Sequence, residues 1–210
     1  ANTNALIGCS HGKNSSQTWM AMTALDANRA KAQVANKCSV SISDIKKMTI
    51  WGNHSPTMYP DLDNAEINSK SVSSLIDDNN WIEENFLKIV QQRGKAIIDA
   101  RGASSATSAA NAAIDTVKAT LTETPKDDWF SAAVMSDGSY NVPEGLIFGF
   151  PLRVNTAGEV SIVQNLPIST YAQEKIDITT QELLDEKSDI SELLWLMAMH
   201  DVLKGMLHLY

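Results

Sequence analysis

The sequence predicts a mixed α/β fold, closer to α+β, in which long helices pack on an antiparallel sheet. Two observations predict it. Residues 23–38 and 80–121 are rich in alanine and charged residues, with apolar positions at near-helical spacing. Residues 130–164 instead read as short strands joined by turns that contain glycine. Strands joined by a short hairpin loop pair antiparallel, so this sheet is not built from strand–helix–strand units.

Length, charge and cysteine content narrow the function classes. The chain has 210 residues, enough for one sizeable domain with its own core. A formal net charge of −8 at pH 7 argues against a nucleic-acid partner. The sequence has no run of 18 apolar residues that would span a membrane. Cys9 and Cys38 make neither a disulfide framework nor a metal site, so we expect a cytoplasmic protein without a bound metal.

The first third of the chain is expected to contain a loop, a helix and a strand. Residues 8–18 are polar, contain two glycines and read as a loop. Thr23, with Asp26 three residues later, has the spacing of a helix N-terminus. The alanine-rich helix that follows should end near Cys38. Residues 48–51 read as the end of a strand, which a Gly-Asn pair terminates.

The middle of the chain predicts two long helices. Asn80, with Glu83 three residues later, can cap the first one, although Gly94 interrupts its apolar pattern. Residues 101–104 (RGAS) should end it. The second helix, residues 105–121, is small-sided and rich in alanine, which permits close packing against the core or a second subunit.

The last third predicts strands, a helix and a tail. The strands are residues 130–135, 146–154 and 160–164, and the helix is expected to start where Thr179 and Glu182 have capping-box spacing. We divide the chain into a domain of residues 1–194 and an apolar tail of residues 195–210. A buried helix, an exposed segment and a translated artefact all fit that tail.

One histidine lies where a reactive side chain would be expected. His54 follows the strand of residues 48–51 and is flanked by Ser and Pro. Rigid scaffolds often hold functional side chains at such exits, and a histidine there can exchange a proton near neutral pH. A hydrogen-bonded turn histidine of purely structural role fits the same pattern.

An acidic and a basic residue upstream favour the catalytic interpretation. Asp26 and Arg29 are three residues apart on one face of the predicted helix. An exposed ion pair is one reading of that spacing. In the other, Asp26 accepts a hydrogen bond from one nitrogen of His54, and Arg29 binds a substrate carboxylate with its planar pair of donors.

These residues also carry a resemblance. The segments LDANRAKAQ (25–33) and IWGNHSPTMYPD (50–61) resemble the catalytic segments of NAD-dependent malate dehydrogenases of the cytosolic type. Further matching segments follow in the family's order: QQRGKAIIDARGASSATSAANAAIDTV (91–117), SDGSYNVPEGLIFGFP (136–151) and EKIDITTQELLDEK (174–187). The resemblance runs from Ala1 to about Leu194, and lactate dehydrogenases resemble the chain less.

The resemblance implies a reaction and a set of site residues. It implies reversible oxidation of malate to oxaloacetate with NAD, a step of the tricarboxylic acid cycle, by a homodimer. His54 and Asp26 would be the catalytic pair, with His54 facing the nicotinamide, and Arg29 would bind substrate. The family's pocket also includes a hydroxyl that corresponds to Ser104, for which a simple helix cap is an equal alternative. Ala27 departs from the family, which usually has a larger residue there.

The resemblance covers only the catalytic half of such an enzyme. No G-x-G occurs in the chain, although a dinucleotide site needs a strand, a G-x-G-x-x-G turn and a helix N-terminus. We therefore expect the nucleotide-binding half to be absent, and the chain alone to be inactive and prone to association. Lactate dehydrogenase activity on the same scaffold, or a non-catalytic dimerisation or interaction remnant, remain as alternatives.

Overall fold

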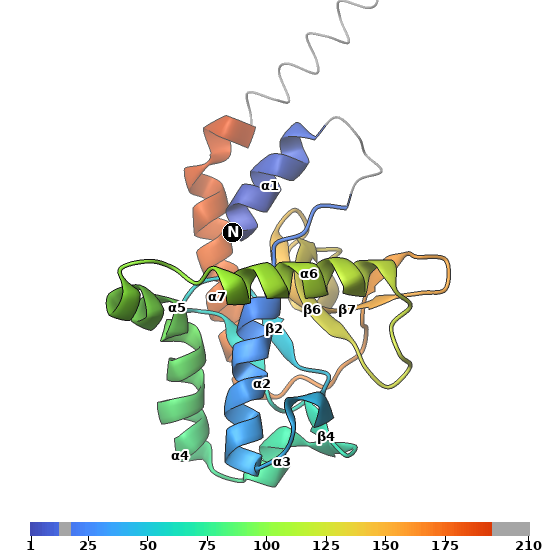
Figure 1. Ribbon diagram of the computed structural model, residues 1–210. Helices are drawn as coiled ribbons and strands as arrows, with labels where there is room; N and C mark the ends of the chain where they lie inside the picture. The colour runs from blue at the N-terminus through green and yellow to red at the C-terminus, as the bar shows by residue number, and fades with distance from the viewer. Residues whose placement is uncertain (13–17, 195–210) are drawn as a thin grey trace, which may run out of the picture.

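The computed structural model describes residues 1–12 and 18–194 (Figure 1). The predicted tail, residues 195–210, lies outside the described residues. The helices are α1 (Asn2–His11), α2 (Ala24–Cys38), α3 (Val72–Ile76), α4 (Asn79–Trp81), the π-helical η2 (Ile82–Leu87), α5 (Lys88–Arg101), α6 (Thr107–Leu121) and α7 (Thr170–Asp189), with 3₁₀ turns η1 (Ile42–Asp44) and η3 (Ser139–Asn141). The strands are β1 (Ile45–Lys46), β2 (Thr49–Trp51), β3 (Tyr59–Asp61), β4 (Glu66–Ile67), β5 (Lys70–Ser71), β6 (Phe130–Met135), β7 (Ile147–Val154) and β8 (Val160–Ile162).

All pairings between these strands are antiparallel. β6, β7 and β8 form a three-stranded sheet with β7 in the centre, β2 pairs with β3, and β1, β4 and β5 form a second small sheet. A bridge between Gly52 and Gly149 attaches the β2–β3 hairpin to β7. In Figure 1, α6 crosses the sheet of β6 and β7, and α2 runs beneath it. The predicted mixture of helices and antiparallel strands is confirmed.

Large aromatic side chains fill the core between β2 and β7. Trp51, Phe148 and Phe150 are fully buried. The ring of Trp51 lies edge-on to Phe150, with centroids 6.1 Å apart, and such pairs stabilise cores beyond their buried area. The indole Nε1 of Trp51 donates to the buried carboxylate of Asp61 at 3.0 Å. This bond joins the two strands that flank the His54 loop.

The N-terminal segment is more helical than its sequence suggested. The prediction of a loop over residues 8–18 is wrong up to His11, because α1 continues to that residue. Ala5 and Leu6 are buried against Ala133 and Ile147 of the sheet. Figure 1 shows α1 beside the end of α7. This tertiary packing, rather than local propensity, accounts for the extra turn.

Two helices begin close to where the sequence predicted, but the residues predicted to cap them do not do so. α2 begins after Thr23, yet the Thr23 hydroxyl bonds Ser131 Oγ at 2.9 Å and caps nothing. The run that contains α5 is capped by Asp78, which accepts from Trp81 N, and not by Asn80. A capping box formed by Ser41 and Asp44 is present at η1.

The other two predicted helix starts are wrong. α6 begins at Thr107 and not at residue 105, and its N-cap Ala106 offers no side-chain cap. α7 begins at Thr170, where Ser169 accepts from Ala172 N. Thr179 and Glu182 therefore lie inside α7, since the buried helix face already starts with Ala172.

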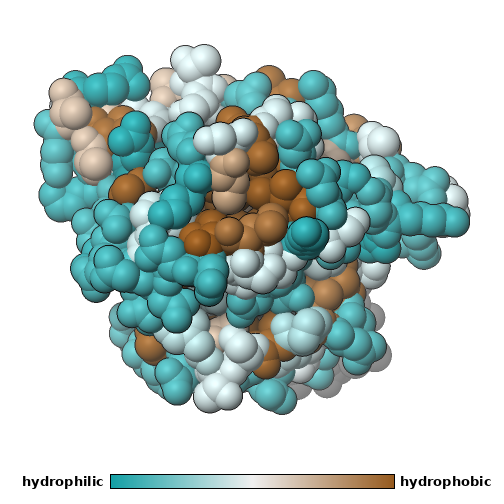
Figure 2. Space-filling model, turned by 90° about the horizontal axis from the view of Figure 1, so that it is seen from below, coloured by the Kyte–Doolittle hydropathy of each residue, from teal (hydrophilic) through white to brown (hydrophobic). Residues whose placement is uncertain are grey.

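The face of the molecule seen from below is partly hydrophobic. Figure 2 shows hydrophobic side chains gathered in a hollow on this face. At this end, Val40, Ile67, Leu75 and Ile76 help to line a pocket of about 480 Å³. None of the described helices is both long and apolar enough to cross a membrane.

Two glycines allow the β2–β3 hairpin to reach the main sheet. Gly52 and Gly149 exchange backbone hydrogen bonds at 3.2 and 2.9 Å. A Cβ on Gly149 would collide with the carbonyl oxygen of Ile50 and come within 2.9 Å of that of Gly52. Both obstacles are backbone atoms, which cannot rotate away. Only glycine at position 149 therefore permits this contact.

We predict that Gly149→Ala destabilises the fold. The expected loss of unfolding free energy is about 1–3 kcal/mol or more, the usual cost of overpacking, measured by urea denaturation. Gly94→Ala is the matched control, because the nearest atom to its Cβ would be Arg29 Nη1 at 3.9 Å. Alanine is the better helix former, so the control should be neutral or stabilised by up to about 1 kcal/mol. Equal stability of Gly149→Ala and wild type would contradict this packing.

Candidate active site

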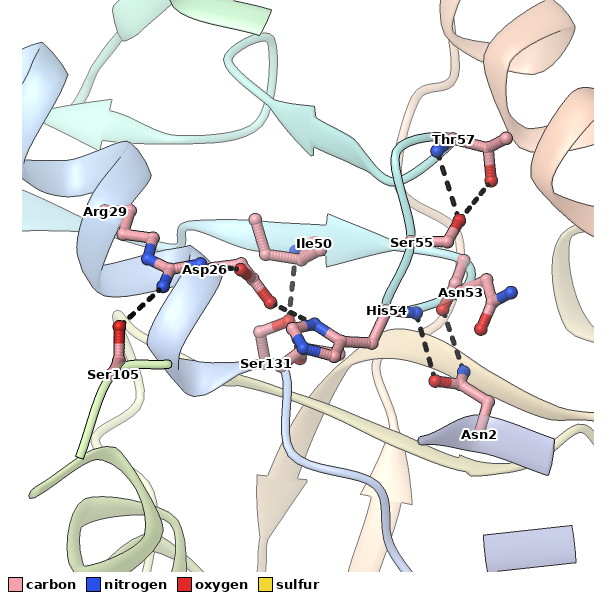
Figure 3. Close-up of polar contacts among 12 residues, drawn as sticks. Asn2, Asp26, Arg29, Ile50, Asn53, His54, Ser55, Thr57, Ser105 and Ser131 are labelled. Atoms are coloured by element: carbon pink, nitrogen blue, oxygen red, sulfur yellow. Dashed lines mark hydrogen bonds and ion pairs between the residues drawn. The ribbon is translucent and has the colours of Figure 1, made fainter. Parts of the chain in front are cut away.

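A tight turn brings His54 out of the sheet. β2 ends at Trp51, and Gly52 then adopts a φ of +93°, a conformation that favours glycine. A side chain on Gly52 would also collide with Thr179 of α7. Thr179 Oγ1 instead accepts a hydrogen bond from Asn53 N at 2.9 Å. The chain thus turns against α7 and presents His54 towards α2 (Figure 3).

The structure brings His54 and Asp26 into direct contact. His54 Nδ1 lies 2.6 Å from Asp26 Oδ2. The Asp26 side chain is fully buried, whereas the imidazole is 35% exposed. Neither atom has a hydrogen-bond partner among the described residues, so the pairing is a close charge contact. A proton on Nδ1 would have Asp26 Oδ2 as its nearest acceptor, which leaves Nε2 to exchange protons with a ligand.

Arg29 shares the same carboxylate. Its Nη1 donates to Asp26 Oδ1 at 2.9 Å, so each oxygen of the buried Asp26 has one basic partner. The sequence also allowed an exposed ion pair between Asp26 and Arg29. The pair is instead largely buried, since only 15% of the Arg29 side chain is accessible. A buried carboxylate needs such pairing to offset its lost hydration.

The hydroxyl beside Arg29 belongs to the residue after the predicted one. Arg29 Nη2 donates to Ser105 Oγ at 3.3 Å. Ser104 is exposed, has no side-chain hydrogen bond to Arg29 and caps no helix. Both serines lie in the connection between α5 and α6. Figure 3 shows Ser105 beside Arg29. The structure thus joins Asp26, Arg29 and His54 but does not join Ser104 to them.

Asn2 ties the His54 backbone to the two strands beneath it. Its Oδ1 accepts from His54 N at 3.1 Å. Its Nδ2 donates to Gly52 O at 3.1 Å and to Ile147 O at 2.9 Å. The Asn2 side chain is completely buried, so three of its hydrogen-bonding positions are used inside the protein.

Glu182 of α7 holds the loop that contains His54. Its Oε2 accepts hydrogen bonds from Asn53 Nδ2 at 2.9 Å, Ser55 Oγ at 2.5 Å and Thr57 Oγ1 at 2.6 Å. Burial alone would raise the pKa of the Glu182 carboxyl, but these three hydrogen bonds outweigh burial and lower that pKa.

A pocket of about 780 Å³ opens beside Arg29. It lies between α2, α5 and α6, and its lining includes Arg29, Arg93, Asn28 and Asn111. His54 does not line it, so the pocket meets the site only on the side of the guanidinium. No group of three or more His, Cys, Asp or Glu side chains suited to a metal ion occurs in residues 1–12 and 18–194.

Comparison with known proteins places this arrangement in a family. Residues 23–194 match the model for the α/β C-terminal domain of lactate/malate dehydrogenases. The chain belongs to this family. The matched range contains Asp26, Arg29 and His54 but not Asn2.

Solved structures of family members have the same fold. The chain is 40% identical to malate dehydrogenase from Naegleria fowleri, with a TM-score of 0.84 over 92% of this chain. It is 30% identical to Trichomonas vaginalis lactate dehydrogenase in complex with NADH and oxamate, with a TM-score of 0.86 over 93% of this chain. The chain spans 59% and 61% of the length of these two proteins.

The anchors of the His54 loop were not found from the sequence. Asn2 and Glu182 are far from His54 along the chain, and neither has a local signal that points to it. Glu182 and Thr179 were interpreted as a capping box, since the same spacing also puts two residues on one helix face. Ser105 was passed over for its neighbour Ser104, because only the fold decides which hydroxyl faces Arg29.

We predict that Glu182 stabilises the fold less in acid. A carboxyl whose pKa is lowered by folding stabilises the native state above its unfolded pKa, and this contribution disappears as the pH falls through the folded pKa. The stability difference between wild type and Glu182→Gln should therefore be constant near neutral pH and shrink below the ordinary value of 4.5. Urea denaturation across that range measures it.

The control for this measurement is Glu174→Gln, which removes an exposed carboxylate from the same helix. Its stability relative to wild type should change less between neutral pH and about pH 3. A difference between wild type and Glu182→Gln that does not depend on pH would show that the Glu182 charge is not what the loop hydroxyls stabilise.

Proposed function

We propose that the chain is the substrate-binding and catalytic part of an NAD-dependent malate dehydrogenase of the cytosolic type. The observation that carries the proposal is the buried Asp26 carboxylate, which contacts His54 with one oxygen and Arg29 with the other. A proton-transfer group and an anion-binding group thus share one anchor. The 40% identity to the Naegleria enzyme supports malate as the substrate.

His54 would transfer the proton in this reaction. As malate is oxidised, its C2 hydroxyl proton would pass to His54 Nε2 while the C2 hydrogen leaves with its electron pair. In the reverse direction the imidazolium would return the proton to the oxaloacetate carbonyl oxygen. Asp26 Oδ2 lies 2.6 Å from Nδ1, where its charge would fix the ring and stabilise the imidazolium.

Arg29 would orient the substrate. With Nη1 held by Asp26, the guanidinium is fixed beside the imidazole and offers its remaining N–H groups to a carboxylate. The bond to Ser105 Oγ is long at 3.3 Å, so a C1 carboxylate could replace it at little cost. Fixing that carboxylate would hold the C2 carbon near His54, which is a positioning effect.

NAD would supply the hydride acceptor. Within the described residues, the imidazole of His54, about a third of which is exposed, is the group suited to face its nicotinamide. The sequence has no G-x-G turn that would bind the pyrophosphate. The chain would therefore contact only the nicotinamide end of the cofactor. We expect residues 1–210 alone to be inactive.

A lactate dehydrogenase is the second candidate. The Trichomonas lactate dehydrogenase, solved in complex with NADH and oxamate, matches 93% of this chain at 30% identity. The two candidates differ in whether the substrate has a second carboxylate. The test is NADH oxidation with oxaloacetate and with pyruvate, by the protein with a nucleotide-binding domain ahead of Ala1. Preference for oxaloacetate supports the proposal, and preference for pyruvate overturns it in favour of the second candidate.

We further propose homodimer formation through α6. Ile114, Val117 and Leu121 lie three to four residues apart on this helix and are 54–80% exposed. Such a stripe is suited to a helix of a second subunit. A non-catalytic role in assembly alone would leave turnover of both keto acids absent even when a nucleotide-binding domain is present.

We predict that His54→Ala removes most turnover. A general acid–base group typically contributes about 10²–10⁴-fold, so kcat for oxaloacetate reduction should fall by that factor in the protein with its nucleotide-binding domain. His11→Ala, an exposed histidine at the end of α1, is the matched control and should keep wild-type kcat. Near-normal turnover of His54→Ala would show that His54 is not the base.

We predict that Arg29→Lys weakens substrate binding selectively. Lysine keeps the charge but loses the planar pair of donors. The KM for oxaloacetate should rise roughly 10–100-fold, the effect of losing one charged hydrogen bond, while the Kd for NADH stays near that of wild type. Arg101→Lys, at an exposed position near the end of α5, is the control. An equal loss of NADH affinity would indicate a structural ion pair instead.

A further inference from the structure

Three side chains of the loop around His54 bond to one carboxylate from a distant helix. Asn53, Ser55 and Thr57 all donate to Glu182 Oε2, at 2.9, 2.5 and 2.6 Å. These residues lie immediately before His54, immediately after it and three positions after it. One acceptor thus fixes the side chains on both sides of the histidine.

Other contacts also hold this loop. Asn2 Oδ1 accepts from the backbone N of His54 at 3.1 Å. Glu186 contacts Asn53 Nδ2 at 2.7 Å, and its other oxygen accepts from Thr3 of α1. Thr179 Oγ1 accepts from Asn53 N and bonds Thr57 Oγ1. Glu182 Oε2 accepts from the hydroxyl of Ser55, the residue directly after His54, and that hydroxyl also bonds Thr57 Oγ1 at 2.9 Å.

The imidazole itself has little else to hold it. Its side chain is 35% exposed, and its Nδ1 contacts Asp26 Oδ2 alone. The orientation of the ring therefore depends on where the loop backbone places it. A shift of the loop by about 1 Å would take a 2.6 Å contact out of hydrogen-bond range.

We propose that Glu182 is a positioning residue for His54, which holds the imidazole against Asp26 through Asn53, Ser55 and Thr57. Glu182 touches neither the imidazole nor Asp26, so it acts only through the loop. The consequence for turnover rests on the proposed function. The consequence for His54 does not, because the orientation and tautomer of the ring can be measured without substrate or cofactor.

The test is the tautomer of His54 in the full 210-residue chain. Long-range ¹H–¹⁵N correlation spectra of ¹⁵N-histidine-labelled protein separate the Nδ1–H and Nε2–H forms of the neutral ring. His54→Asn assigns the signal. The variants are Glu182→Leu, which removes every acceptor, and Glu182→Gln, which keeps the shape and one acceptor. Glu174→Gln removes an exposed carboxylate from the same helix and is the control.

Wild type and Glu174→Gln should show the Nδ1–H form of His54 alone. Loss of one hydrogen bond to a charged acceptor shifts a local equilibrium by about tenfold or more. Glu182→Leu should therefore show both forms, with a smaller change in Glu182→Gln. If Glu182→Leu does not fold, Ser55→Ala combined with Thr57→Val removes two of the three bonds from the loop side and should also give a mixture of the two forms.

Three results would overturn the proposal. They are a mixture of tautomers in wild type, an unchanged single form in Glu182→Gln and in the variants that remove the bonds, or equal changes in the Glu174 and Glu182 variants. None of them bears on whether the protein is a dehydrogenase, since no substrate is present. Conversely, a protein that reduces neither keto acid would disprove the proposed function without changing what the tautomer measurement says about Glu182.

Discussion

The candidate site depends on one buried carboxylate. Asp26 is fully inaccessible, and each of its oxygens contacts a basic side chain, Nη1 of Arg29 at 2.9 Å and Nδ1 of His54 at 2.6 Å. A buried charge without partners would cost several kcal/mol, so the fold requires both contacts. The same requirement places a proton-transfer group beside an anion-binding group. The demands of stability and of chemistry therefore coincide at Asp26.

Packing far from the carboxylate makes that contact possible. Gly52 and Gly149 let the hairpin approach β7 closely, and the bond from Trp51 to Asp61 joins its two strands. Asn2 then ties the backbone of His54 to the sheet, and Glu182 ties the loop to α7. The imidazole is held from three sides while about a third of it stays accessible to a substrate. Rigid support with one exposed edge is the usual design of a functional loop.

Local patterns predicted the parts of this structure that local chemistry controls. The bounds of α2, the end of β2 and the hairpin of β7 and β8 follow from alanine content, the Gly-Asn break and the polar turn. The proximity of Asp26 and Arg29 follows from helix geometry, whereas that of His54 rested on the family resemblance. The extent of α1 and the start of α7 were missed, because both are decided by burial against other elements. Asn2 and Glu182 were missed for the same reason.

A double-mutant cycle on Asp26 and His54 tests most directly whether the two residues act as one unit. The protein with its nucleotide-binding domain is assayed for oxaloacetate reduction as wild type, Asp26→Asn, His54→Ala and the double variant. If Asp26 acts only through the imidazole, the double variant should have the kcat/KM of His54→Ala within about threefold, because residues that work as a unit are strongly non-additive. If the two losses multiply instead, Asp26 and His54 contribute independently and the shared anchor is not the basis of the site.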